Sequence, residues 1–266
     1  MTSTFGGYEE YKYTAEFYDE VYERVRNKDA DFYVQYSKLA AGRMLELGCG
    51  TGRILLPIAI SGCEITGLDL SPYMLARCKA KLKEQSGEVQ ARVKLIHGDM
   101  ASFMTGEQYS LVITPFRAFQ HLISVEQQQS CLGCIRQHLT SRGLWIVDVF
   151  NPFPPALVDD PKYRAEREDF PEMQLRDGRT LRRTSSTIAF HRNLQYNKLE
   201  LIYYVSHPDG RTERFVHTFP MRYFFRYEME HLLSLCGFAI VDLFGDFDKS
   251  AFSDSSPEMI FVAKKK

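Results

Sequence analysis

The sequence predicts an α/β protein with a doubly wound, mostly parallel seven-stranded sheet and an antiparallel β insertion. Three observations lead to this prediction. Between residues 43 and 151, short apolar runs alternate with stretches of helical periodicity, which is typical of a parallel sheet covered by helices. Residues 48–52 form a glycine-rich turn directly after the first apolar run. From residue 152 onward, prolines and two Asp-Gly pairs interrupt the alternation, and such pairs favour β-hairpins.

Five strands and three helices are expected in the first half of the sheet. The strands are Met44–Leu47, Glu64–Asp69, Val93–His97, Leu111–Thr114 and Leu144–Phe150, and the helices lie near 52–61, 72–85 and 125–140. Ser71 and Pro72 mark one helix start, because serine is a good N-cap and proline suits the first helical position. Ligands of such sheets bind beyond the carboxyl ends of the strands, so we expect the site there.

The second half of the chain predicts the insertion and the closing strands. One Asp-Gly pair precedes the run Arg179–Arg192, and the other lies between the runs Lys198–His207 and Thr212–Phe225, which indicates hairpins. Phe225–Cys236 returns to helical periodicity with Gly237 as the C-cap, and the last two strands are Ala239–Gly245 and Met259–Ala263. We therefore expect three parts, which are an N-terminal helical lid (1–42), a core (43–152 plus 226–266) and an antiparallel β insertion (153–225).

The glycine-rich turn is the most informative motif of the chain. It reads Leu-Glu-Leu-Gly-Cys-Gly-Thr-Gly-Arg over residues 45–53, and its glycines let the backbone approach a ligand closely. A dinucleotide fingerprint would need a third glycine at the position of Arg53, which disfavours the alternative of a nicotinamide oxidoreductase. With Glu46 in the preceding strand, the segment resembles motif I of class I S-adenosylmethionine (SAM) dependent methyltransferases, which have a Rossmann-like fold.

Three further segments strengthen the resemblance. Asp69 ends the second strand about twenty residues after the glycines, where an acid can accept hydrogen bonds from ribose hydroxyls. The Gly-Asp-Met sequence at Asp99 and Met100 resembles the adenine-binding element of the family. Residues 110–122 resemble the strand and loop that bring the methyl acceptor to the sulfonium, although Ser110 stands where the family often has aspartate.

The resemblance implies SAM as the cofactor and S-adenosyl-L-homocysteine as the product. It implies that Asp99 accepts from the adenine amino group, and that the backbone N–H of Met100 donates to the ring. The expected cofactor contacts are Glu46, Gly48, Cys49, Gly50, Arg53, Asp69, Leu70, Met74, Asp99, Met100, Pro115 and Phe116. A SAM-binding protein without catalysis is a second alternative at this stage.

The sequence motifs for the acceptor site are less specific than those for the cofactor site. The position of the insertion resembles that in small-molecule N-methyltransferases of the amino-sugar and glycine or sarcosine types, where such a sheet roofs the acceptor or forms a subunit interface. A small-molecule acceptor and a homodimer are therefore the expected partners. A nitrogen acceptor needs only a neutral lone pair, whereas a hydroxyl benefits from a base such as histidine. The sequence leaves nitrogen and oxygen acceptors open.

His121 is the candidate base, because it follows the fourth strand on the acceptor side, and the alternative for it is a packing or capping histidine. Tyr18 is the second catalytic candidate, because the Tyr-Asp segment at Tyr18 resembles the lid of small-molecule methyltransferases. Arg117 is a candidate anion anchor, with a surface ion pair as the alternative, and Phe119 is a candidate wall of the acceptor pocket. The prediction of a lid is based on an N-terminal group of tyrosines and an apolar stripe, namely Tyr8, Tyr11, Tyr13, Tyr18, Tyr22, Tyr33, Tyr36, Phe17, Val21 and Val25.

Composition excludes several other functions. The net charge of −1 gives no reason to expect nucleic acid or an anionic membrane as a partner, and the loop after the fourth strand lacks the Asn/Asp-Pro-Pro-Tyr/Phe motif of nucleic-acid methylation. The six cysteines and the lack of a signal or transmembrane run predict a cytoplasmic protein. Cys131 and Cys134 have the spacing of metal ligands but fall in a predicted helix without a second pair, so no metal site is expected.

Overall fold

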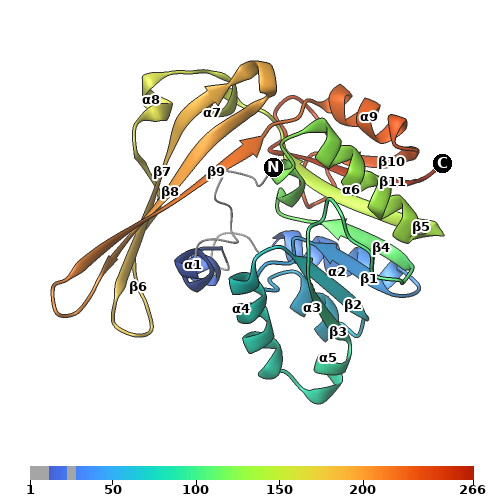
Figure 1. Cartoon of the computed structure of the whole chain (residues 1–266), viewed down its shortest axis with the longest axis horizontal. Coiled ribbons are helices and arrows are strands. Elements are labelled where there is room, and N and C mark those ends of the chain that lie inside the picture. The colour runs from blue at the N-terminus through green and yellow to red at the C-terminus, as the bar shows by residue number, and fades with distance from the viewer. Residues whose placement is uncertain (1–11, 23–27) are drawn as a thin grey trace.

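The computed structural model describes residues 12–22 and 28–266, which form two β-sheets with helices around the larger one (Figure 1). The larger sheet has seven strands in the order β10-β11-β5-β4-β1-β2-β3. Its strands are β1 (Met44–Leu47), β2 (Ile65–Asp69), β3 (Val93–His97), β4 (Tyr109–Thr114), β5 (Leu139–Phe150), β10 (Phe238–Phe244) and β11 (Glu258–Lys265). The first five strands are parallel, and β11 is antiparallel to both β5 and β10. The predicted fold class is confirmed.

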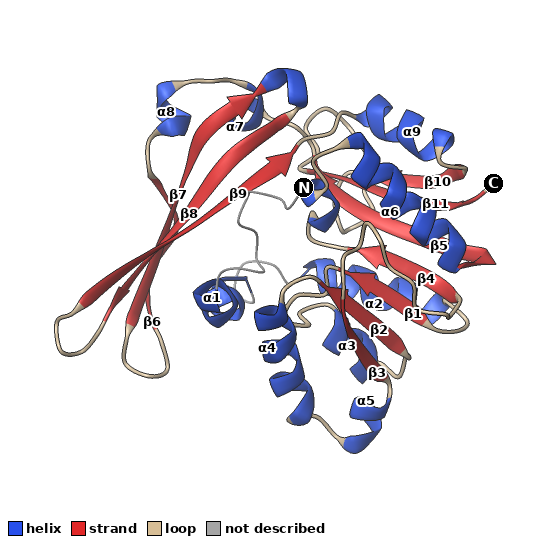
Figure 2. Ribbon diagram, viewed as in Figure 1, coloured by secondary structure: helices blue, strands red, loops and turns tan. Residues whose placement is uncertain are grey.

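Helices cover both faces of this sheet (Figure 2). One apolar cluster joins Trp145 and Val147 of β5 to α6 (Val125–His138) and α9 (Arg226–Leu235). The other joins Ile146 to α2 (Lys28–Leu39), α3 (Leu55–Ile60) and α4 (Pro72–Lys83). Because side chains alternate across a strand, β5 contributes to both clusters, so the strand is apolar on both faces. A short helix, α5 (Gly87–Ala91), precedes β3.

Two predicted helix ends are confirmed. The Ser71 hydroxyl accepts a hydrogen bond from the Met74 N–H at the start of α4. Gly237 follows α9 with a φ of +80° and donates its N–H to Ser234. Among the bounds that differ from prediction, α3 is shorter because the glycine turn continues to residue 54, and β5 begins five residues earlier than expected, at Leu139.

The insertion is a four-stranded antiparallel sheet in the order β6-β7-β8-β9. Its strands are β6 (Arg167–Gln174), β7 (Thr180–His191), β8 (Tyr196–Ser206) and β9 (Thr212–Arg222), with short helical turns at α7 (Pro154–Leu157), α8 (Pro161–Arg164) and η2 (Arg192–Leu194). The Asp-Gly pairs lie in the β6–β7 and β8–β9 turns, as predicted. The sequence does not mark β6, since Pro171 and several charges interrupt its apolar pattern, which is tolerated on an edge strand.

Helix α1 (Lys12–Tyr22) lies between α4 and the insertion (Figure 1). Phe17 and Val21 are buried against the insertion, in an apolar cluster with Leu181, Tyr203 and Phe219. The predicted stripe of this helix is therefore a packing face toward the inserted sheet. Tyr8, Tyr11 and Val25 of the predicted lid lie outside the described residues.

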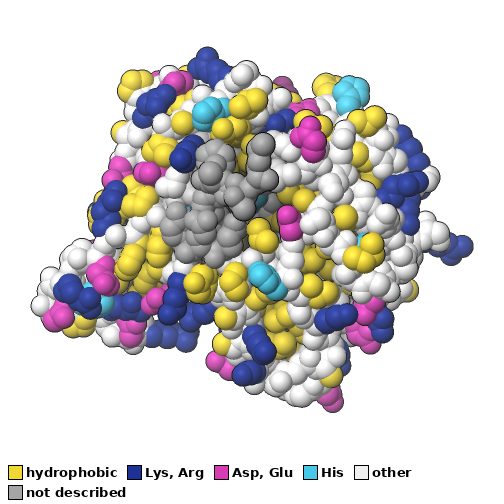
Figure 3. Space-filling view, in the orientation of Figure 1, with side chains coloured by type: hydrophobic (Ala, Val, Ile, Leu, Met, Phe, Trp, Pro, Cys, Tyr) yellow, Lys and Arg dark blue, Asp and Glu magenta, His cyan; other side chains and the backbone are white. Residues whose placement is uncertain are grey.

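On the face seen in Figure 3, basic and acidic side chains are interspersed, including at the tip of the insertion. This mixture differs from the continuous basic track typical of nucleic-acid binding. In the part of the chain that the structure describes, no helix is long and apolar enough to cross a membrane.

Candidate cofactor and acceptor site

The three glycines of the turn between β1 and α3 have different roles. Gly48, Gly50 and Gly52 all have positive φ, at +72°, +54° and +84°. A Cβ on Gly48 would lie 2.8 Å from the Cβ of Ala118, and one on Gly52 would lie 2.7 Å from the Cys78 sulfur. Among the described residues, a Cβ on Gly50 would meet nothing within 4 Å. Packing therefore requires Gly48 and Gly52, whereas Gly50 presents its backbone to open space that a ligand can enter.

Asp69, at the end of β2, is tied directly to this turn. Its carboxylate accepts hydrogen bonds from the Gly50 N–H at 2.7 Å and the Ser71 N–H at 2.8 Å, and the residue is 9% exposed. The predicted proximity of the glycine turn and the acid after β2 is thus present. A carboxylate has about four lone-pair positions, so these two bonds leave acceptor capacity for ribose hydroxyls.

Glu46 lies in β1 just before the turn and is 2% exposed. Burial raises its pKa well above the usual range, an effect that Arg53 opposes and Asp69 reinforces. Among the described residues, its Oε2 has no hydrogen-bond partner. A buried carboxylate oxygen without a donor is costly, so this atom is a position where a cationic donor from a ligand would be stabilised.

The N-terminal helices hold the other side of the turn. The Thr51 hydroxyl donates to Asp19 of α1 at 2.5 Å. Arg53 donates to both oxygens of Asp29 of α2, at 2.8 and 2.6 Å. Sequence reasoning missed Asp29 as a partner of the turn. The sequence gives little indication of this role, because acids are common in the first turn of a helix, where they interact favourably with the helix dipole. Arg53 therefore lies in the turn, but its guanidinium is hydrogen-bonded to Asp29 of α2.

The expected adenine side lies at the ends of β2 and β3. Leu70 is 44% exposed, and Met74 is buried behind it. Asp99 accepts a hydrogen bond from the Ala101 N–H at 2.8 Å, which orders the loop after β3. Met100 lies beside the turn, with its terminal carbon 3.5 Å from the position of a Cβ on Gly48. Met100 is therefore a neighbour of the glycine turn.

Cys49 differs from the expectation in how it can contribute. Its side chain is buried and faces β2, where its sulfur would lie 2.8 Å from a Cβ on Gly67. Burial also raises the pKa of its thiol well above the usual value, which makes it unreactive. Only its backbone can contact a ligand.

The loop after β4 has an unusual backbone. Pro115 is buried, and Phe116 and Arg117 both have positive φ, at +57° and +63°. Asp148 of β5 accepts from the N–H groups of both residues, at 2.9 and 3.0 Å. Its Oδ1 also accepts from the Tyr33 hydroxyl of α2 at 2.5 Å. Strained non-glycine residues held by buried hydrogen bonds concentrate at functional sites.

Asp148 was also missed by sequence reasoning, and Tyr33 was named only as one of the lid tyrosines, not as a partner of this acid. The sequence does indicate that Asp148 is unusual, since it is the one acid in the apolar segment 144–150. A charge in a buried strand needs a polar partner. The sequence could not say which loop would supply it.

Aromatic rings cover the Phe116 side of the loop. The Tyr22 and Tyr18 rings of α1 lie 4.9 and 6.2 Å from the Phe116 ring, and the Arg53 guanidinium lies 4.8 Å from it. The Tyr22 hydroxyl accepts a hydrogen bond from Arg183 of β7 at 2.8 Å. Burial raises the pKa of Tyr18, so its phenol stays protonated at neutral pH. Tyr22 therefore lies at the junction of α1, the loop and the insertion, and the Tyr18 ring lies 4.6 Å from it.

His121 ends the short η1 helix (Ala118–His121) and faces the insertion. Its ring lies 5.6 Å from the Phe219 ring of β9, and His217 of the same strand lies 4.8 Å from that ring. Burial lowers the pKa of His121 to about 4. Burial, then His121 and then Arg183, lower the pKa of His217 to about 3. Both imidazoles are therefore neutral at physiological pH. His191, by contrast, stacks on Tyr196 at 4.4 Å near the η2 turn.

Two expectations on the acceptor side are corrected. Phe119 is fully buried against Trp145 and Phe224, so it belongs to the core and does not line the acceptor side. Successive residues of one helical turn point in different directions, which separates it from His121. Arg117 donates to Glu258 of β11 at 2.6 Å, so its charge is already matched and the ion-pair alternative describes it better than an anion anchor.

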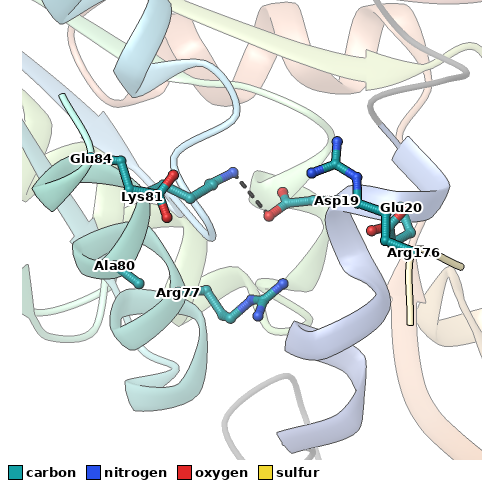
Figure 4. A pocket seen from close by; sticks show the side chains of 7 residues that line it. All are labelled: Asp19, Glu20, Arg77, Ala80, Lys81, Glu84 and Arg176. Atoms are coloured by element: carbon teal, nitrogen blue, oxygen red, sulfur yellow. Dashed lines mark ion pairs between the residues drawn. The ribbon is translucent and has the colours of Figure 1, made fainter.

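Two clefts lie on the helix side of the glycine turn. One has a volume of about 310 Å³ and separates α1 from α4 (Figure 4), where it is lined by Asp19, Glu20, Arg77, Ala80, Lys81, Glu84 and Arg176. The other, of about 500 Å³, includes Gly52 and Arg53 and shares Lys81 and Glu84 with the first. Neither includes Glu46 or Asp69, so we place the candidate site at the strand ends from its hydrogen bonds and open backbone. Within residues 12–22 and 28–266, no cluster of three His, Cys, Asp or Glu side chains could hold a metal ion.

Comparison with known proteins identifies a domain within the chain. Residues 44–143, from β1 into β5, match the family model described as a methyltransferase domain. The chain therefore contains a methyltransferase domain, and the expected SAM-dependent methyltransferase activity is supported. This assignment replaces both the nicotinamide oxidoreductase and the non-catalytic SAM-binding alternatives.

The methyltransferase is similar to relatives along most of its length. It is 25% identical to dTDP-3-amino-3,6-dideoxy-alpha-D-glucopyranose N,N-dimethyltransferase from Streptomyces fradiae, over 85% of this chain and 84% of the relative. Among solved structures, the CcbJ methyltransferase from Streptomyces caelestis aligns with a TM-score of 0.75 at 24% identity, over 97% of each chain. SAM-bound CalS10, an amino pentose methyltransferase from Micromonospora echinaspora, aligns with a TM-score of 0.69 at 22% identity, over 96% of each chain.

Proposed function

We propose that this methyltransferase methylates the amino group of a small sugar-like acceptor. The observation that carries the choice of nitrogen is the pair of neutral histidines beside the acceptor loop, with pKa values of about 4 for His121 and about 3 for His217. A general base works best when its pKa is near the working pH, so an imidazole with a pKa near 4 activates a hydroxyl poorly. A neutral amine needs no such base, because its lone pair is already nucleophilic.

The relatives support an amino sugar as the acceptor class. The Streptomyces fradiae relative and one from Streptomyces venezuelae are both named as N,N-dimethyltransferases of dTDP-linked amino sugars. The chain covers 84% and 78% of their lengths, so the similarity extends beyond the domain at 44–143.

The cofactor-side residues have roles that follow from their positions. SAM, when bound, supplies a methyl group on a positively charged sulfur. In the proposal, Glu46 accepts from the ammonium group of the cofactor, Asp69 accepts from the ribose hydroxyls, and the Gly50 backbone lies against the ligand. Asp99 and Met100 bind the adenine, while Leu70 and Met74 form its apolar wall.

In the acceptor half, residues align the amine rather than activate it. With cofactor bound, the new N–C bond would form as the S–C bond breaks, and the proton of the methylated amine would pass to water. The rings of Tyr18, Tyr22 and Phe116 exclude water from the reacting atoms, so most of the acceleration comes from alignment in a dry site.

The lid (1–42) and the insertion (153–225) together close the acceptor side over the core (43–152 plus 226–266). Contacts of α1 with the insertion and of His121 with Phe219 support this use of the inserted sheet. Its alternative use as a subunit interface, and with it a homodimer, stays a prediction. A cytoplasmic location also stays a prediction.

A pair of matched acceptors tests the proposal. The purified protein is incubated with methyl-labelled SAM and either dTDP-3-amino-3,6-dideoxy-α-D-glucopyranose or the same nucleotide sugar with a hydroxyl at position 3. We expect label on the amine alone, with one and then two methyl groups by mass spectrometry. Equal labelling of the hydroxyl sugar would contradict a nitrogen acceptor, and labelling of neither would reject this class of sugar.

A further inference from the structure

Asp19 is the contact point between the N-terminal lid and the cofactor turn. Its carboxylate is buried in the junction of three elements that are far apart in the sequence, namely α1, the glycine turn and α4. The Thr51 hydroxyl donates to Oδ1 at 2.5 Å, and the Lys81 ammonium lies 2.9 Å from Oδ2. Figure 4 shows the Asp19–Lys81 ion pair at the head of the cleft between α1 and α4.

The partner of Asp19 in the turn is positioned by the same backbone that faces the ligand. Thr51 is fully buried and stands between Gly50 and Gly52, both in the left-handed region. The Gly50 N–H is fixed by Asp69, and the space in front of Gly50 is open. A ligand that orders the backbone at Gly50 therefore also orders the Thr51 hydroxyl that α1 binds.

An adjacent face of α1 reaches the acceptor side. Tyr18 and Tyr22 cover the Phe116 ring in the loop after β4. Tyr22 also accepts from Arg183 of the insertion. One short helix thus contacts the cofactor turn through Asp19 and the acceptor side through the neighbouring tyrosines.

We propose that Asp19 is a positioning residue that couples cofactor binding to closure of the acceptor site. Binding of cofactor fixes the turn, the fixed Thr51 hydroxyl holds Asp19, and α1 then places Tyr18 and Tyr22 against the acceptor loop. Coupling is reciprocal, so loss of the Asp19 contact also weakens cofactor binding. The proposal does not depend on which acceptor is methylated.

The test uses S-adenosyl-L-homocysteine as the ligand and the full chain as the protein. Calorimetry measures its affinity, and hydrogen exchange with mass spectrometry follows the amides of 12–22 and 48–52 with and without it. In the wild-type protein we expect the ligand to protect both segments. In Asp19→Ala, we expect about tenfold weaker binding, within the usual range of coupling between sites, and protection of 48–52 alone.

Four further variants distinguish coupling from a general loss of structure. Thr51→Val keeps the size of the side chain and removes the hydroxyl, so it should reproduce the loss of α1 protection, while Thr51→Ser should restore it. The double variant Asp19→Ala/Thr51→Val should bind no more weakly than Asp19→Ala alone. Glu20→Ala is the matched control, because Glu20 is the next residue on the same helix and lines the same cleft, and it should retain wild-type affinity and protection.

Each outcome bears on the proposal. Unchanged ligand affinity and unchanged α1 protection in Asp19→Ala would overturn it. Additive losses in the double variant would also overturn it, because Asp19 would then act independently of Thr51. If Asp19→Ala does not fold, the comparison of Thr51→Val with Thr51→Ser decides the proposal alone.

Discussion

The proposed cofactor half and the proposed acceptor half of the candidate site are built in different ways. The cofactor half comes from one glycine turn and the ends of neighbouring parallel strands, and its side-chain acceptors are the carboxylates Glu46 and Asp69. The acceptor half combines α1, η1 and β9, which are far apart in the sequence, and presents aromatic rings and neutral imidazoles. Carboxylates suit a ligand with an ammonium group and hydroxyls. An apolar half favours the neutral form of an amine, since burial lowers the pKa of a basic group.

The largest expected effect lies in the cofactor half, at Gly50. Gly50→Val should weaken SAM binding at least about 100-fold, because the new side chain fills the open space beside the backbone and is strained at a φ of +54°. Circular dichroism should show a retained fold, and calorimetry should show the lost affinity.

Gly210→Val is the matched control for Gly50→Val. Gly210 lies in the β8–β9 turn with a φ of +85° and open space around its Cβ position, so the backbone strain is similar. This variant should lose comparable stability and keep its affinity for SAM. If Gly50→Val also binds normally, the glycine turn is structural and the comparison between the two halves fails.

The acceptor half should control the stability of the protein in acid. His121 and His217 have folded pKa values of about 4 and about 3, below the ordinary value of 6.5, so between these values the unfolded chain binds more protons. Stability is therefore complete above pH 6.5 and falls as the pH decreases toward 4. For His121 alone the loss approaches about 3 kcal/mol, since one pKa unit corresponds to about 1.4 kcal/mol.

Urea unfolding at a series of pH values measures this loss. His217→Leu should flatten the dependence between pH 6.5 and 4, because one buried imidazole no longer has to remain neutral. His191→Leu, in the same sheet but stacked on Tyr196, is the control and should leave the dependence unchanged. An unchanged slope in His217→Leu would show that another group dominates acid unfolding.

The two halves also differ in how well the sequence predicts them. In the cofactor half, Gly50 and Asp69 are separated by one βα unit of regular length, so local pattern and parallel topology suffice to bring them together. The seven-stranded sheet and the hairpins of the insertion were predictable for the same reason, because apolar periodicity and Asp-Gly turns are local signals.

The contacts of the acceptor half depend on packing between distant segments. Nothing local indicates that Asp148 holds the strained backbone of Phe116 and Arg117, or that Glu258 neutralises Arg117. Phe119 was misassigned because the sequence does not say in which direction each residue of a short 3-10 turn points. Side-chain direction and partner choice, rather than element type, limited the prediction of the site.

Asp69→Ala tests the cofactor half at a smaller scale than Gly50→Val. We expect SAM affinity to fall by about 1–3 kcal/mol, because the substitution removes the acceptor for two ribose hydroxyls and frees the Gly50 N–H. Calorimetry measures the change, and Asp69→Asn, which keeps one carbonyl oxygen, should lose less. Unchanged affinity in Asp69→Ala would remove Asp69 from the cofactor contacts.

The smallest effect is expected at His121, in the acceptor half. With an amine acceptor, His121→Ala should lower kcat by less than about tenfold, because an imidazole with a pKa of about 4 contributes through packing rather than through proton abstraction. A true general base would cost roughly 10²–10⁴-fold. The rate is measured against pH in both proteins, and in both it should follow the ionisation of the amine itself. A decrease in kcat above about 100-fold, together with a changed pH profile, would instead show that His121 acts as a base. The acceptor half would then use an ionisable side chain, as the cofactor half does.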